Sequence, residues 1–224
     1  MNRQDGYAKL IARRRTCTAC AGVCNPATVA QGAFDQAEIG PWTKWQGRLD
    51  APVFVVGQDF SDRKYFEKWK GEDRPNNTTN MNLIKLFASI GIDIREPSQG
   101  GDRGEAFFTN AILCLKEGGM QAKVRAEWFV NCGSRFLRPQ IELVQPRVVV
   151  GLGSRAHNAV LSAFGFPQER LRDAVRSEGT PLPGGAIAIA VYHCGARVIN
   201  INRGLDEQMA DWKRVRRTLG ASAV

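Results

Sequence analysis

The chain has 224 residues, of which 43% are hydrophobic and 24% charged, and this size and composition are typical of one globular domain. No apolar run approaches the roughly 20 residues that a membrane-spanning helix needs, and residues 1–15 lack an apolar signal-peptide core, so we expect a cytoplasmic protein associated with a bacterial nucleoid. The 31 lysines and arginines against 22 aspartates and glutamates give a net charge of +9, which suits a partner with a phosphate backbone.

Apolar runs that alternate with helical patterns predict an α/β fold over residues 1–224, a single domain. We expect a three-layer αβα arrangement, in which helices cover both faces of a central, mostly parallel four-stranded sheet. The predicted strands are the apolar runs 53–56, 106–113, 147–151 and 186–192. The predicted helices are 4–15, 62–70, 80–90 with Asn80 or Thr79 as its cap, 124–144 with a kink or break at Pro139, 154–164, 168–176 and 205–219.

Polar side chains stand at or just beyond the ends of three predicted strands. Asp59 follows the first strand closely, Asn110 lies within the second and His193 follows the fourth. Because ligands bind outside the carboxyl ends of parallel strands, these three side chains are candidates for one site. Each also has a structural explanation: Asp59 as a helix cap, Asn110 as a partner for buried backbone groups, and His193 as a hydrogen-bonded core histidine.

Four segments resemble the uracil-DNA glycosylase superfamily, and the resemblance extends over most of the chain. GQDF at 57–60 is similar to the Gly-Gln-Asp-Pro first motif of that superfamily. TNAILC at 109–114 and the sequence from 131 to 153 resemble the iron–sulfur, or family 4, branch, and VYHCGARV at 191–198 resembles the second catalytic motif. The resemblance implies a DNA repair glycosylase that flips uracil out of DNA and hydrolyses the N-glycosidic bond, with other deaminated bases as further candidate substrates.

The resemblance implies a division of labour among the three strand-end residues. Asp59 would stabilise the positive charge that develops on the sugar and orient the attacking water. His193 would donate a hydrogen bond to uracil O2 as negative charge accumulates there. Asn110 would pair with the N3–H and O4 edge of uracil and reject cytosine. The products would be an abasic site and free uracil.

The remaining substrate contacts come from the first motif. Gly57 and Gln58 would place backbone amides near uracil O2. Phe60 is our candidate for the ring that stacks on the base, with Tyr65 and Trp69 as alternatives.

Two arginines beyond the second motif are candidate DNA contacts. Arg197 would probe or fill the gap left in the duplex, and Arg203 would bind phosphate. An ordinary solvated charge is the alternative for both residues. We expect the protein to act as a monomer.

The chain has six cysteines, and in a protein of a reducing compartment these favour metal or cluster binding over disulfides. Cys17 and Cys20 form a CxxC pair, and the resemblance adds Cys114 and Cys132 as the other two ligands of a structural 4Fe-4S cluster that would tie down the N-terminal segment. Cys24 could replace Cys20 in the first pair. A structural zinc ion and buried free thiols are the alternatives.

The chain departs from the iron–sulfur branch at three points. It has GQDFS in place of Gly-Glu-Ala-Pro-Gly, Pro75 is followed by Asn-Asn-Thr rather than Phe-Val-Gly, and His193 is followed by Cys-Gly. These departures leave open a second function, a protein of the same fold that binds uracil or lesions in DNA without excising the base. An unrelated iron–sulfur redox protein is a third hypothesis.

Overall fold

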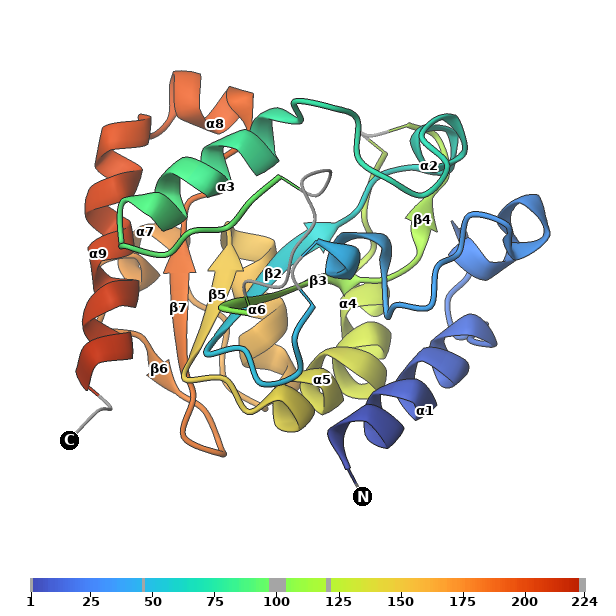
Figure 1. Ribbon diagram of the computed structural model, residues 1–224, viewed down its shortest axis with the longest axis horizontal. Helices are drawn as coiled ribbons and strands as arrows, with labels where there is room; N and C mark the ends of the chain where they lie inside the picture. Colours follow the sequence, from blue (N-terminus) through green and yellow to red (C-terminus); the bar gives the residue numbers. More distant parts are fainter. Residues whose placement is uncertain (1, 46, 97–103, 120–121, 222–224) are drawn as a thin grey trace.

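The computed structural model describes residues 2–45, 47–96, 104–119 and 122–221 (Figure 1). Its centre is a five-stranded sheet in the order β3-β2-β5-β7-β6. Four of these strands run parallel: β2 (Val53–Asp59), β3 (Ala106–Ile112), β5 (Val148–Leu152) and β7 (Ile187–Val191). The predicted α/β class and the four predicted strands are therefore confirmed.

The fifth strand, β6 (Thr180–Pro181), was not predicted. It pairs antiparallel with β7 at one edge of the sheet. Two residues, one of them a proline, produce no alternating or continuous apolar pattern from which a strand could be inferred. The same applies to β1 (Val23–Cys24) and β4 (Leu115–Lys116), which form a separate antiparallel pair beside the main sheet.

Helices cover both faces of the sheet (Figure 1). In chain order they are α1 (Arg3–Arg15), α2 (Arg63–Lys68), α3 (Thr78–Ala88), α4 (Ala126–Cys132), α5 (Arg138–Val144), α6 (Ser154–Ala163), α7 (Leu171–Ala174), α8 (Ala196–Ile201) and α9 (Leu205–Ala221). Two 3₁₀ segments, η1 (Pro26–Gly32) and η2 (Pro41–Lys44), lie in the long stretch before β2. Across the described ranges, no helix has the length and apolar character required to cross a membrane.

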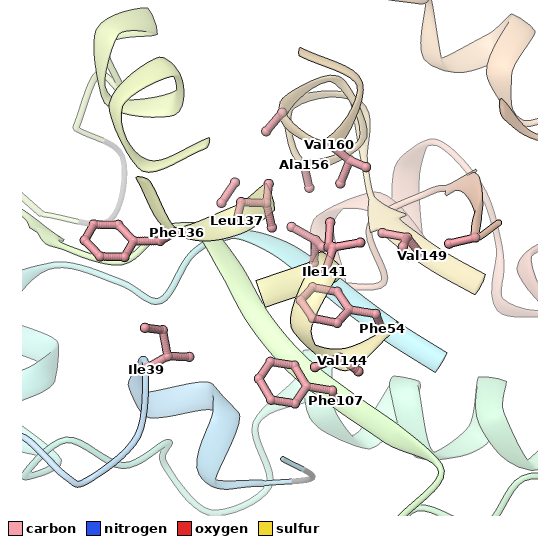
Figure 2. Close-up of a cluster of buried hydrophobic side chains, with 14 of the residues drawn as sticks. Ile39, Phe54, Phe107, Phe136, Leu137, Ile141, Val144, Val149, Ala156 and Val160 are labelled. Atoms are coloured by element: carbon pink, nitrogen blue, oxygen red, sulfur yellow. The ribbon is translucent and has the colours of Figure 1, made fainter. Parts of the chain in front are cut away.

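The two faces of the sheet bury alternate residues of each strand, as the period of two requires. Phe54, Phe107 and Val149 face α5 and α6, where Ile141 and Val160 complete the cluster drawn in Figure 2. On the other face, a second cluster packs under α3 and α9; it includes Val53, Val55, Phe108, Val150, Leu86, Phe87 and Trp212. The sheet is therefore covered on both sides, which explains why its strands are continuous apolar runs.

The predicted break at Pro139 takes the form of a π-helical turn. Gly133–Leu137 form this turn between α4 and α5, and Pro139 lies in the first turn of α5. A proline removes one backbone donor and collides with the carbonyl four residues earlier, here Arg135. The wider turn accommodates the proline, and the Arg135 carbonyl instead accepts a hydrogen bond from Arg13.

Other helix boundaries differ from the prediction because their caps lie elsewhere. Asn77, rather than Asn80 or Thr79, caps α3, and its side chain accepts a hydrogen bond from the Thr79 backbone at 2.9 Å. The predicted helix at 168–176 is only the four-residue α7. The six-residue α8, which was not predicted, has no fully buried residue.

Buried polar contacts attach the N-terminal segment to the domain. Arg14 is almost fully buried in α1 and pairs with Asp35 at 2.7 Å. The Tyr7 hydroxyl donates to Glu38 at 2.6 Å, and burial raises the pKa of this phenol. Removing one member of a buried charged pair leaves the other without a partner, so these contacts restrict where α1 can lie.

We expect Phe54→Ala to lower the free energy of unfolding by about 3–5 kcal/mol, because Phe54 is fully buried in β2, an interior strand of the sheet, and stacks on Phe107. Urea denaturation followed by circular dichroism measures this change. Val130→Ala is the control: Val130 is 65% exposed, and its replacement should change stability by less than about 0.5 kcal/mol. Equal effects of the two substitutions would contradict the assignment of the core.

Candidate active site

A cavity of about 880 Å³ opens at the carboxyl ends of the parallel strands. It is lined by residues from the ends of β2, β3 and β7, including Gly57, Gln58, Asp59, Phe60, Asn110 and His193. The structure thus brings together every residue that the sequence suggested for catalysis or substrate binding. We call this space the base cavity.

Asp59 is the last residue of β2 and is held by two neighbours. Its Oδ1 lies 3.0 Å from the Nζ atom of Lys116, and its Oδ2 accepts a hydrogen bond from the Gln58 side chain. The side chains of Asp59 and Lys116 are each only 6% exposed. The carboxylate is therefore fixed in one orientation by contacts that water scarcely reaches.

Asn110 lies directly opposite Gly57 in the register of β2 and β3. A Cβ atom at position 57 would come within 2.4 Å of the Asn110 Oδ1 atom, so only glycine leaves room for this amide. No hydrogen bond among the described residues engages the Asn110 side-chain amide, and the residue lines the base cavity. Its donor and acceptor atoms are thus available to a ligand.

His193 follows β7, and its ring is oriented by the backbone. The Gly195 N–H donates a hydrogen bond to Nδ1 of His193 at 2.9 Å. Because Nδ1 is an acceptor, the proton of the neutral ring is on Nε2. Burial lowers the pKa of His193, and the negative charge of Asp59 raises it by a smaller amount. The imidazole is therefore neutral at physiological pH, with Nε2–H as a donor.

Gly195 is a residue of the site that the sequence reasoning missed. A Cβ atom at position 195 would lie 2.9 Å from both Cε1 and Nδ1 of His193. A side chain there would push the ring away from its place. The Cys-Gly sequence that departs from the family motif thus has a steric role, which only the position of the ring reveals.

Aromatic rings form one wall of the base cavity. Phe60, Tyr65 and Trp69 all line it, so each of the three stacking candidates is within the site. Phe60 and Tyr65 meet edge to face with their centroids 6.0 Å apart. Phe60 also lies edge-on to the fully buried Phe66, which limits its movement.

A second carboxylate, Asp73, lines the same cavity and was not singled out from the sequence. It accepts hydrogen bonds from Asn77 at 3.0 Å, Asn80 at 2.9 Å and the Tyr65 hydroxyl at 3.1 Å. Burial raises the pKa of Asp73. The polar run NNTTN that follows Pro75 was the only sequence signal for this network, and it supplies the two asparagines.

The two candidate DNA-binding arginines differ in their surroundings. Arg197 is exposed on α8, whose residues Ala196 and Val198 line the base cavity. Arg203 forms two hydrogen bonds to Asp211 at 2.7 and 2.8 Å and lies 3.0 Å from Glu207. With two carboxylates already beside it, Arg203 is less suited to bind phosphate than Arg197.

Five cysteines line a second cavity of about 390 Å³, which we call the cysteine cavity. They are Cys17, Cys20, Cys24, Cys114 and Cys132. Burial, together with charges on the neighbouring cysteines, raises the pKa of the Cys114 thiol well above its usual range and that of Cys132 to about 11.

The cysteine cavity gathers the four thiols predicted as ligands of an iron–sulfur cluster. The four predicted ligands come from the segment after α1, the end of β3 and the last residue of α4, and a cluster would join these elements. A bound metal would also stabilise the thiolates that burial disfavours. In the described ranges, no three cysteine, histidine, aspartate or glutamate side chains are close enough together to hold one metal ion.

The sixth cysteine lies elsewhere. Cys194 is fully buried next to His193, and its thiol donates a hydrogen bond to the Thr79 carbonyl at 3.4 Å. Burial raises the pKa of this thiol to about 12, so it stays protonated and unreactive.

Residues 45–213 match the profile of the Uracil DNA glycosylase superfamily, which covers most of the chain. The chain belongs to this superfamily. A type-5 uracil-DNA glycosylase from Pyrobaculum aerophilum is 28% identical over 178 residues, which are 77% of this chain and 72% of that protein. The superfamily resemblance drawn from the motifs is thus confirmed. The assignment to the family 4 branch is not, because the relative is named for type 5.

For this member of the superfamily, we expect nitrogen-detected NMR to find both histidines titrating below pH 6.5, because burial lowers the pKa of His157 and of His193. The chemical shifts of His193 should identify the Nε2–H tautomer. In Asp59→Asn, the pKa of His193 should fall further, since the carboxylate charge that raises it is gone. A rise, or no change, would contradict the geometry described here.

Proposed function

We propose that the protein is a monofunctional uracil-DNA glycosylase, which hydrolyses the N-glycosidic bond of uracil flipped out of DNA and leaves an abasic site and free uracil. The observation that carries the proposal is the convergence of Asp59, Asn110 and His193 on one cavity in a member of the superfamily. The name of the P. aerophilum relative supports the choice of uracil.

The leaving group is the first chemical requirement. Cleavage puts negative charge on the departing uracil, and a neutral donor stabilises that charge without first having to lose a proton. His193 has the required state, because its ring is neutral and the Gly195 N–H occupies Nδ1. Its Nε2–H would donate to uracil O2, and this bond would strengthen as the charge develops.

The sugar is the second requirement, since it becomes positively charged as the bond breaks. Asp59 supplies a negative charge at the end of β2, in the same cavity as His193. A fixed carboxylate stabilises the cation and orients a water molecule for attack. Lys116 and Gln58 hold the carboxylate in place, so little reorganisation is needed during the reaction.

Base selection follows from the Asn110 amide, which is available for ligand contacts. An amide donates to O4 and accepts from N3–H of uracil, whereas cytosine presents a donor where uracil has O4 and an acceptor at N3. A pocket built for one hydrogen-bond pattern leaves polar groups unpaired with the other. Phe60, on the aromatic wall, would stack on the same ring.

DNA binding rests on the positive charge of the chain and on the mouth of the cavity. The net charge of +9 favours contact with phosphates. At the mouth, α8 places Arg197 and Ile201, which is 73% exposed, at the surface. We propose that α8 enters the space that the flipped nucleotide leaves, with Arg197 as the probing residue.

A 4Fe-4S cluster in the cysteine cavity is the second part of the proposal. Cys17, Cys20, Cys114 and Cys132 would hold it, and Cys24, on the same cavity wall, is the alternative to Cys20. A bound cluster would be a structural crosslink between segments that are far apart in sequence. The residues proposed for hydrolysis all line the base cavity, so we assign the cluster no role in the chemistry.

We expect His193→Ala to reduce the single-turnover rate on uracil-containing DNA by about 10²–10³, and Asp59→Asn to cause a comparable loss, because both groups act on charge present mainly in the transition state. Affinity for uracil-containing DNA, measured by fluorescence anisotropy, should change little. The rate is measured by alkaline cleavage of the DNA at the abasic sites that the reaction produces. His157→Gln is the matched control, since His157 is buried in α6 away from the base cavity.

Two outcomes of this assay would overturn the proposal. Tight binding of uracil-containing DNA by the wild-type protein, without any abasic sites, would favour the non-catalytic lesion-binding function. Strand cleavage without alkali would contradict a monofunctional hydrolase.

We expect protein purified without oxygen to contain iron and acid-labile sulfide and to absorb broadly in the visible range. Cys114→Ser should lose most of the iron, and Cys194→Ser should retain it, because Cys194 lies outside the cysteine cavity. Elemental analysis measures both. Zinc in place of iron, or equal iron in the two variants, would contradict the cluster.

A further inference from the structure

Lys116 is a buried lysine that no part of the sequence pattern indicated. It is 4% exposed, lines the base cavity and places its Nζ atom 3.0 Å from Asp59. A buried lysine is uncommon without a carboxylate partner, and a buried carboxylate is likewise unstable alone. The two charges therefore constrain each other, and the position of Asp59 depends on that of Lys116.

The backbone of Lys116 is tied to the same loop as Asp59. Its N–H donates to the Ser61 carbonyl at 3.3 Å, and the residue forms a parallel bridge with Asp62. Lys116 thus reaches Asp59 both through its side chain and through the loop that follows β2. Displacing the lysine would move the end of that strand.

The segment that carries Lys116 also forms a wall of the cysteine cavity. Cys114 and Glu117, on either side of β4, line that cavity, while Lys116 lines the base cavity. β4 pairs with β1, whose second residue is Cys24, opposite Leu115. Residues 114–117 therefore line both cavities, and two cysteines line the cysteine cavity at the small sheet: Cys24 in β1 and Cys114 immediately before β4.

We propose that Lys116 is a positioning residue for the Asp59 carboxylate and that it couples the cysteine cavity to the base cavity. A well-ordered cysteine cavity keeps β1 paired with β4. The β4 strand in turn fixes the position of Lys116, and Lys116 fixes the Asp59 carboxylate. The effect of this coupling on catalysis rests on the proposed function. The structural coupling between the two cavities can be measured whether or not the protein is active.

The first test is a double-mutant cycle on thermal stability and rate. Lys116→Met keeps a long unbranched side chain and removes its charge. It should lower the melting temperature, because the buried Asp59 carboxylate loses its charged partner. Adding Asp59→Asn should recover much of that loss, because the charge without a partner is then gone. Purely additive shifts in melting temperature would overturn the proposal.

In single-turnover assays, Lys116→Met should reduce the rate by about 10², the cost of a small misplacement of a catalytic group, with little change in DNA affinity. In the Asp59→Asn background it should have almost no further effect, since a positioning residue acts only through the group that it positions. Lys44→Met is the control; Lys44 forms an exposed pair with Glu72, and its loss should alter neither rate nor stability. A loss as large in the Asp59→Asn background as in the wild type would overturn the positioning role.

The second test measures the coupling by hydrogen exchange with mass spectrometry. In Cys114→Ser, peptides covering 115–117 and 57–62 should exchange faster, because the Lys116 N–H and its Ser61 acceptor are released together. Peptides from β7 should keep their protection. Faster exchange at 115–117 without change at 57–62 would contradict the coupling, and an inactive wild-type protein with both peptides coupled would contradict only the proposed function.

Discussion

The parallel register of β2 and β3 is the constraint on which the site depends. It places Gly57 opposite Asn110, and a Cβ atom at position 57 would be 2.4 Å from the amide oxygen. A slip of one residue would turn every side chain of the strand to the opposite face of the sheet, so the same register also decides which residues enter the core. Core packing and the position of the Asn110 amide are thus specified by one set of backbone hydrogen bonds.

Much of this arrangement could be predicted from the sequence because it follows from local patterns. The four parallel strands are continuous apolar runs, and polar residues near their carboxyl ends must meet at one edge of the sheet. For this reason Asp59, Asn110 and His193 could be grouped before any coordinates were known. The motif resemblance supplied the cysteines, which the structure places around one cavity.

The parts that could not be predicted depend on contacts between distant segments. Lys116 belongs to a two-residue strand whose partner is nearly a hundred positions away, and neither strand is long enough to have a pattern of its own. Gly195 matters because of the ring that it approaches, and Asp73 because of the asparagines that fold back onto it. Their roles are set by tertiary structure, where short polar segments leave no periodic signal.

The short edge strand β6 has a consequence for the behaviour of the protein in solution. An exposed sheet edge is a template on which another chain can add a strand, and this is a common route to aggregation. At one edge β6 offers only two residues, of which Pro181 has no N–H to donate, and at the other edge Gly47 forms an antiparallel bridge to Phe107 of β3. Both margins of the sheet are thus poor templates, which favours a dispersed protein at high concentration.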